Sequence, residues 1–96
     1  MRNWLKGMPE EERREIGVDI KTVQFGWPLG MPLVDHVEGD IWEVRTRLAT
    51  RIARVLFSLE GGDMILLHGF IKKERKTSKS DLELARQRLK KLRSAS

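Results

Sequence analysis

Three apolar-rich runs separated by short turns occupy the middle of the chain, at residues 41–48, 51–60 and 64–73. The first two alternate apolar and polar side chains with a period of two, which is typical of strands with one buried face. Gly61 and Gly62 are a tight-turn signal between the second and third runs. This order of strands and turns predicts an antiparallel meander, in which the third run, apolar on both faces, is the most covered strand.

Helices are predicted on both sides of these runs along the chain. Pro9 and the three glutamates after it indicate a helix start, because carboxylates complement the positive end of the helix dipole. Ile16, Ile20 and Val23 then recur at helical spacing, which predicts a helix at about 9–25.

A second helix is predicted from about residue 79 to 93, after the capping pattern Ser78-x-x-Asp81. Its apolar stripe consists of Leu82, Ala85, Leu89 and Leu92. Near the N-terminus, residues 1–8 predict a helical turn that packs on the body. Residues 33–37 predict a short extended segment.

Together these elements predict an α+β fold in a single domain of residues 1–96. It has an N-terminal helix or helical hairpin, an antiparallel sheet and a C-terminal helix. The sheet has three strands, with four as the alternative. We expect helices to cover one face of it and chemistry to lie on the other. That second face carries the polar positions of the first two runs, Glu43, Arg45, Arg47 and Arg54.

Positive charge is concentrated at the end of the chain. The formal net charge is +5, yet residues 71–96 alone hold ten Lys/Arg and three Asp/Glu. This asymmetry favours an anionic partner, with nucleic acid first, and the alternative is a solvated helix face. With no cysteine and only two histidines, we expect no disulfide, no metal and no cofactor. No run approaches the length of a membrane span and no secretory segment is present, so we expect a cytoplasmic protein without a membrane partner.

Several motifs resemble one family when they are taken together. They are residues 41–45 (IWEVR), 51–57 (RIARVLF), 67–73 (LHGFIKK), Thr77 and a later Leu84-Ala85-Arg86. Over roughly residues 9–93 the chain resembles the HigB-type, phage-derived branch of the RelE/ParE toxin superfamily. Relatives begin with a strand before the first helix, whereas only eight residues precede Pro9 here. That strand is either missing or replaced by residues 1–8.

The resemblance implies a RelE-like fold and the toxin of a type II toxin–antitoxin system. Most members are ribosome-dependent mRNA endoribonucleases, which inhibit translation by metal-independent RNA cleavage. The implied partners are a helix-turn-helix, HigA-like antitoxin, mRNA on the ribosome and ribosomal RNA. The sequence leaves the assembly open between a homo-oligomer and a heteromeric toxin–antitoxin complex.

Four residues are the candidates for catalysis. Arg54 lies where RelE-type toxins carry a phosphate-binding arginine, and its alternative is a buried arginine paired to a carboxylate. Arg45 matches a position that is often a lysine in RelE-type enzymes, and we expect it to contact phosphate. Glu43 is either the general base or an ion-pair partner of the arginines. Lys72 lies where the superfamily places a basic catalytic or substrate-binding residue.

Other residues are expected to bind RNA or the ribosome, namely Lys73, Arg75, Lys76 and Arg47. His68 is a candidate base, with a hydrogen-bonded core histidine as the alternative. The chain has no tyrosine, so Phe70 is the nearby candidate for base stacking, with a core role as its alternative. Two other functions stay open: an inhibitor of the ParE, DNA gyrase-poison kind, and a prophage-derived inactive relative.

Overall fold

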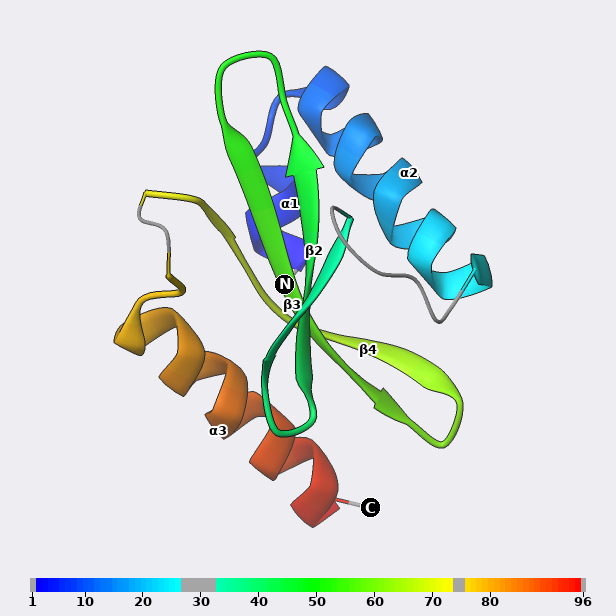
Figure 1. The fold of residues 1–96 in the computed structure, drawn as a ribbon, viewed down its shortest axis with the longest axis vertical. Coiled ribbons are helices and arrows are strands. Elements are labelled where there is room, and N and C mark those ends of the chain that lie inside the picture. The colour runs from blue at the N-terminus through cyan, green and yellow to red at the C-terminus, as the bar shows by residue number, and fades with distance from the viewer. Residues whose placement is uncertain (1, 27–32, 74–75, 96) are drawn as a thin grey trace.

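Four antiparallel strands form the centre of the computed structural model, which describes residues 2–26, 33–73 and 76–95. The helices are α1 (Arg2–Lys6), α2 (Glu10–Gly26) and α3 (Lys79–Ala95). The strands are β1 (Val34–Glu38), β2 (Ile41–Arg47), β3 (Ile52–Glu60) and β4 (Asp63–Ile71). Figure 1 shows the two longer helices around the twisted sheet. The predicted α+β class is therefore confirmed.

The sheet follows chain order, β1-β2-β3-β4, with every pair antiparallel. The prediction that residues 64–73 form the most covered strand was wrong, because β4 lies at the edge of the sheet and β3, which has a neighbour on each side, is the more buried strand. The extended segment before Gly39 pairs with β2 as a fourth strand, so the four-stranded alternative is the correct one. Gly39 and the pair Gly61–Gly62 have positive φ angles of 48°, 59° and 88°. Glycine adopts this region without a steric penalty, which suits it to the two tight turns.

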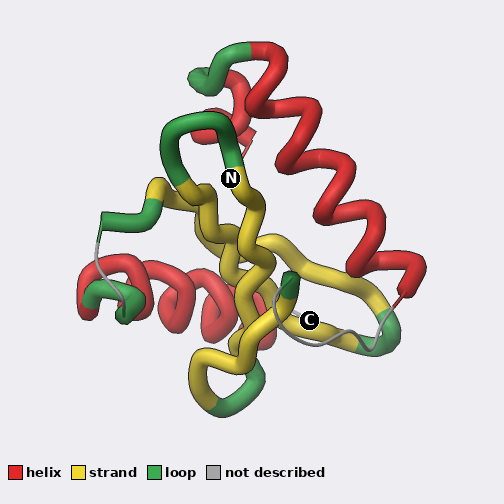
Figure 2. The backbone as a smooth tube through the Cα atoms, turned by 45° about the horizontal axis from the view of Figure 1, so that its top comes forward, coloured by secondary structure: helices red, strands yellow, loops and turns green. Residues whose placement is uncertain are grey.

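Helices lie on both faces of the sheet, with α2 and α3 on opposite sides of the strands (Figure 2). One core is formed where α1 and α2 meet the sheet, around Phe57. A smaller core, around Leu56, lies under α3. The prediction of one open face was wrong, because successive apolar residues of β3 point to opposite faces and each face needs a cover.

The helix boundaries follow the signals in the sequence. Helix α2 starts directly after Pro9 and buries Ile16 and Val23. At the start of α3, Ser78 Oγ accepts a hydrogen bond from the backbone N–H of Asp81 at 3.2 Å, as an N-cap residue does. The predicted stripe of α3 is correct except at its end, since the side chain of Leu92 is 39% exposed. None of the helices in the described ranges is long and apolar enough to cross a membrane.

Helix α1 packs on β4, as the predicted helical turn should. Its Trp4 ring lies directly on the backbone of Gly69. A methyl group at Gly69 would lie 2.5 Å from Trp4 Cζ3 and closer still to Cε3. Only a glycine therefore leaves room for this ring. A short helix, and not a strand, thus precedes α2 in the described part of the chain.

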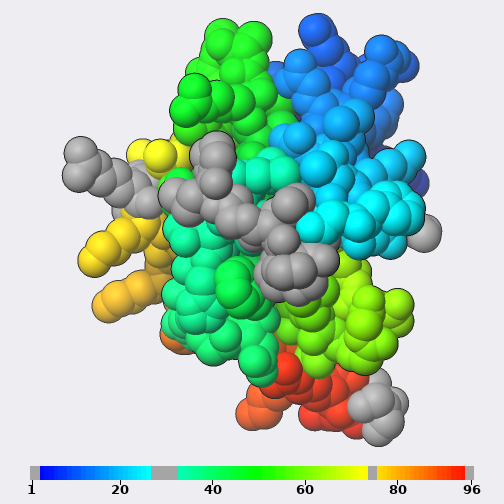
Figure 3. Space-filling model, turned by 45° about the vertical axis from the view of Figure 1, so that its right-hand side comes forward, coloured from blue at the N-terminus to red at the C-terminus, as the bar shows by residue number. Residues whose placement is uncertain are grey.

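Arginines of α3 attach this helix to the turns of the sheet. Arg86 donates two hydrogen bonds to the Glu38 carboxylate, one of them 2.6 Å long. Arg93 donates to Glu60 and to Asp40, each at 2.7 Å. Both turns lie just above the last turns of α3 in the space-filling view (Figure 3). The hydrogen bond from Arg86 lowers the pKa of Glu38 below its ordinary value of 4.5.

This pair predicts a pH dependence of the attachment of α3. Because the pKa of Glu38 is lowered in the folded protein, its stabilising effect is present above about pH 4.5 and is lost as the pH falls through the folded pKa. Urea denaturation of the wild type and Glu38→Gln, followed by far-UV circular dichroism, is the measurement. We expect a difference in midpoint at pH 7 that shrinks towards pH 3. A difference that stays constant with pH would contradict the role of this carboxylate.

Candidate functional site

Two arginines face each other across the centre of the sheet. Arg45 of β2 and Arg54 of β3 are direct cross-strand partners, so their side chains emerge on the same face. Like charges in directly opposed positions destabilise a sheet unless counter-charges separate them. The counter-charges come from two carboxylates on the neighbouring pair of residues. Glu43 lies two residues before Arg45 on β2, and its cross-strand partner is Asp35 of β1.

Glu43 joins the two arginines. Its Oε1 accepts a hydrogen bond from Arg45 Nε at 2.8 Å, and its Oε2 lies 3.7 Å from Arg54 Nη1. Asp35 Oδ2 accepts from Arg45 Nη2 at 3.1 Å. We call this group of four residues the Arg–Glu cluster. Burying these charges is tolerable because positive and negative groups alternate in it.

Burial divides the Arg–Glu cluster into an inner and an outer part. Arg54 and Glu43 are each only 2% exposed. The side chain of Arg45, by contrast, is 29% exposed. Arg54 is therefore a buried arginine paired to a carboxylate, and Glu43 is an ion-pair partner of both arginines. These positions are the structural alternatives that the sequence left open for the two residues. Their catalytic roles stay predictions. In this arrangement Arg45 is the guanidinium that an anionic ligand would meet first.

A cleft of about 320 Å³ opens over the Arg–Glu cluster. All four cluster residues line it, together with Lys76 and Thr77 from the segment before α3. Lys76 is exposed. The cleft thus combines a partly exposed guanidinium and an exposed ammonium group with two carboxylates, the buried one of Glu43 and the partly exposed one of Asp35. Such a site can bind a phosphodiester and stabilise extra negative charge on it.

The remaining basic candidates lie around this cleft. Lys72 and Arg47 line a neighbouring cavity of about 320 Å³, which Arg45 also lines. The backbone N–H of Lys72 donates to Ile52 O at 2.8 Å, so strand pairing extends to this residue. Lys73 and Lys76 line a third cavity. Arg75 lies outside the described residues. The structure therefore brings Arg45, Arg54 and Lys76 together in the cleft, and it places Arg47, Lys72 and Lys73 in the other two cavities.

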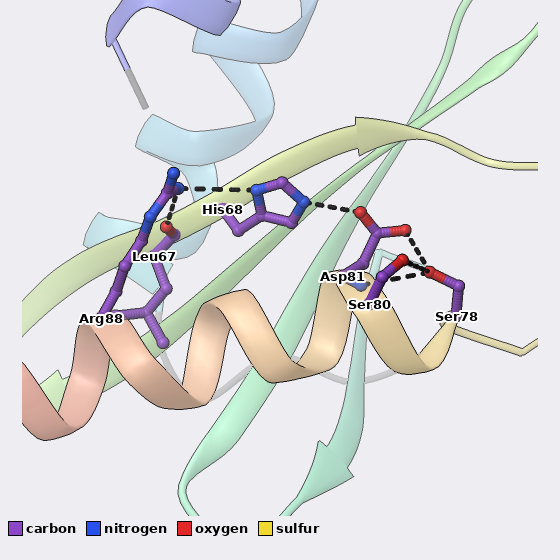
Figure 4. A network of polar contacts seen from close by, with 6 residues as sticks. All are labelled: Leu67, His68, Ser78, Ser80, Asp81 and Arg88. Carbon is purple, nitrogen blue, oxygen red and sulfur yellow. Dashed lines mark hydrogen bonds and ion pairs between the residues drawn. The ribbon is translucent and has the colours of Figure 1, made fainter.

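His68 is held in a polar network between β4 and α3 (Figure 4). Its Nε2 lies 2.7 Å from Asp81 Oδ1, and Asp81 Oδ2 accepts from Ser78 Oγ at 2.6 Å. Arg88 Nη1 donates to Leu67 O at 2.7 Å and lies 3.5 Å from His68 Nδ1. Because a guanidinium only donates, this network assigns the imidazole proton to Nε2. Both ring nitrogens have partners, as the core-histidine alternative requires.

Phe70 lies beside this network and beside Arg54. Its ring stacks on the ring of His68, with centroids 5.7 Å apart and an angle of 20° between the planes. Phe70 is also the cross-strand partner of Arg54. It is only partly buried, and it lines the third cavity. Phe70 is therefore fixed from one side while part of its surface faces a cavity close to the Arg–Glu cluster.

A comparison with protein families shows the family of the chain. Residues 3–90 match the family described as phage-derived protein Gp49-like (DUF891). The chain belongs to this family. The match includes every described residue of the Arg–Glu cluster and of the His68 network, so both are parts of a Gp49-like domain. No curated protein matches the chain.

Sequence reasoning missed several residues around the site of this Gp49-like chain. Asp81 was expected as a helix cap, but its bond to His68 joins residues 13 positions apart and has no signal in the sequence. For Trp4 the only signal in the sequence was its apolar character. Gly69 did carry one, since a glycine inside an apolar strand often marks a close approach of another group. Among the described residues, no group of three or more His, Asp or Glu side chains could hold a metal.

Proposed function

We propose that this Gp49-like protein is a ribosome-dependent mRNA endoribonuclease, the toxin of a type II toxin–antitoxin system of the HigB-type branch of the RelE/ParE superfamily. The observation that carries the proposal is the Arg–Glu cluster at the floor of a cationic cleft. The charge excess of the C-terminal quarter and the phage-derived family support it.

Metal-independent RNA cleavage has three chemical requirements. A base takes the proton of the 2′-hydroxyl, cations stabilise the charge that builds on the phosphorane, and an acid protonates the 5′-oxygen that leaves. Arg45 would perform the second task, which is supported by its partial exposure and its place in the lining of the cleft. Arg54 would assist Arg45 indirectly, because Glu43 interacts with both guanidinium groups. Glu43 is the candidate base, and its Oε2 makes no hydrogen bond to the described residues.

The proposed setting follows from the same chemistry. Lys72, Lys73 and Lys76 would hold the RNA backbone and ribosomal RNA, and such binding weakens as salt rises. The protein would act in the cytoplasm, where translating ribosomes are. A helix-turn-helix, HigA-like antitoxin would neutralise it in a heteromeric complex.

A second candidate rests on the burial of Arg54 and Glu43. Two residues that are 2% exposed and neutralise each other also suit a purely structural role. The protein would then inhibit a target by binding, as ParE-type gyrase poisons do. Induction would in that case produce DNA double-strand breaks and leave translated mRNA intact.

The test is to induce the protein in cells and map the 5′ ends of translated mRNAs. We expect new 5′ ends within minutes, and about 100-fold fewer of them with Arg45→Ala, the scale on which a lost transition-state donor acts. Arg14→Ala is the matched control, because the Arg14 side chain is 75% exposed on α2 and away from the cleft. Intact mRNA during growth arrest would contradict the proposal.

A further inference from the structure

A third cavity follows the outer edge of β4, and the function proposed above does not yet account for it. Its volume is about 550 Å³. It is lined by aromatic, basic and polar residues and by two further residues of β4: Trp4, Phe70, Lys73, Lys76, Ser78, Ser80, Asp81, Gly69 and Ile71. Because β4 is the last strand in the described sheet, this edge has no strand beside it.

Both aromatic side chains are held in place before any ligand binds. Trp4 lies against Gly69, and Phe70 stacks on His68. Successive strand residues point to opposite faces, so the two rings lie at the two sides of the edge of β4. Rigid aromatic surfaces beside cations are what proteins use to stack the bases of single-stranded nucleic acid.

The charges in the cavity favour a nucleotide over a bare anion. Lys73 and Lys76 can contact phosphate, whereas the Asp81 carboxylate in the same wall would repel it. Asp81 and Ser80 can instead accept hydrogen bonds from the amino and imino groups of a base. A base with one flanking phosphate satisfies both kinds of group.

The position of the cavity links it to the Arg–Glu cluster. Lys76 lines both the cleft and this cavity. Phe70 is the cross-strand partner of Arg54. A single strand of RNA whose phosphate lies at Arg45 can therefore continue past Lys76 to the edge of β4.

We infer that this cavity is a subsite for one base of single-stranded RNA, stacked on Trp4, with its phosphate on Lys73 and Lys76. The subsite rests on the proposed nuclease function and extends it. Helix α1 would then contribute directly to substrate binding through Trp4. The chain has no tyrosine that could stack on a base. In this subsite the indole ring of Trp4, from helix α1, would take that role.

The test measures the affinity of purified protein for a fluorescein-labelled 2′-O-methyl RNA heptamer, which cannot be cut by attack of a 2′-hydroxyl. We expect Trp4→Ala to raise the Kd about tenfold. Leu5→Ala is the matched control, because Leu5 packs on the same core from the same helix without lining the cavity. It should change the Kd less than about twofold. Lys73→Ala should raise the Kd more than Lys79→Ala does, and it should also make the Kd less dependent on salt concentration.

Several outcomes would overturn the subsite. Equal effects of Trp4→Ala and Leu5→Ala would show that Trp4 acts only through folding, which circular dichroism of both variants measures. Wild-type protein that does not bind the heptamer would also overturn it, while the mapping of mRNA 5′ ends judges the nuclease separately. An extended peptide or a second copy on the edge of β4 is the competing occupant. Wild-type self-association in the ultracentrifuge that Trp4→Ala abolishes would establish that occupant and overturn the subsite.

Discussion

Arg54→Ala is expected to destabilise the fold by about 3–5 kcal/mol, because it leaves the buried Glu43 carboxylate without one of its two guanidinium neighbours. Denaturation in urea is the measurement. Arg51→Ala is the matched control, since Arg51 pairs with Glu12 near the surface and such pairs contribute about 0–1 kcal/mol. Equal costs for the two changes would contradict the buried pairing of Arg54.

A double variant separates the stability of the Arg–Glu cluster from its chemistry. Replacing Arg54 with Met and Glu43 with Leu removes both charges and keeps much of the volume. We expect this pair of changes to cost less stability than Arg54→Ala alone, because no unpaired charge is left buried. The double variant should nevertheless lose mRNA cleavage. A folded double variant that still cleaves mRNA would show that this part of the cluster is structural only.

Gly69→Ala is the second large effect that we expect, at about 1–3 kcal/mol of destabilisation. The added methyl group would lie 2.5 Å from Trp4 Cζ3, so either the ring or β4 must move. Gly17→Ala is the control, because a Cβ at Gly17 meets no atom within 4 Å in helix α2. Alanine there should stabilise the helix by up to about 1 kcal/mol.

Trp4 supplies the check on this explanation. If the Gly69→Ala cost comes from the Trp4 ring, the double variant with Trp4→Ala should be more stable than the sum of the two single changes predicts, by about 1 kcal/mol or more. Strict additivity of the two changes would contradict the contact. The same double variant should bind RNA no better than Trp4→Ala alone.

Local signals were sufficient to predict most of the fold. Alternating side chains, the Gly61–Gly62 turn and the Ser78 cap predicted three strands and two long helices close to their observed bounds. These features depend on neighbouring residues only. β1 was read as an extended segment and not as a strand, because its pairing with β2 depends on contacts along the sheet and not on its own five residues.

The site was harder to predict because burial depends on the whole fold. Alternation correctly placed Glu43, Arg45 and Arg54 on one face, and their cross-strand positions confirm this. It did not show that Glu43 and Arg54 are buried, because that depends on the cover over their face. The roles of these residues in chemistry stay predictions. The contact between Trp4 and Gly69 joins distant parts of the chain and has no periodic pattern.

The end groups of cleaved mRNA test the central claim most directly. Purified protein is added to ribosomes that translate a defined mRNA, and the termini of the fragments are identified. Attack by the 2′-hydroxyl predicts a 2′,3′-cyclic phosphate on the upstream fragment and a 5′-hydroxyl on the downstream one, and a 2′-deoxy nucleotide at the cut should prevent cleavage. Uncut mRNA, or fragments that begin with a 5′-phosphate, would contradict the proposed function.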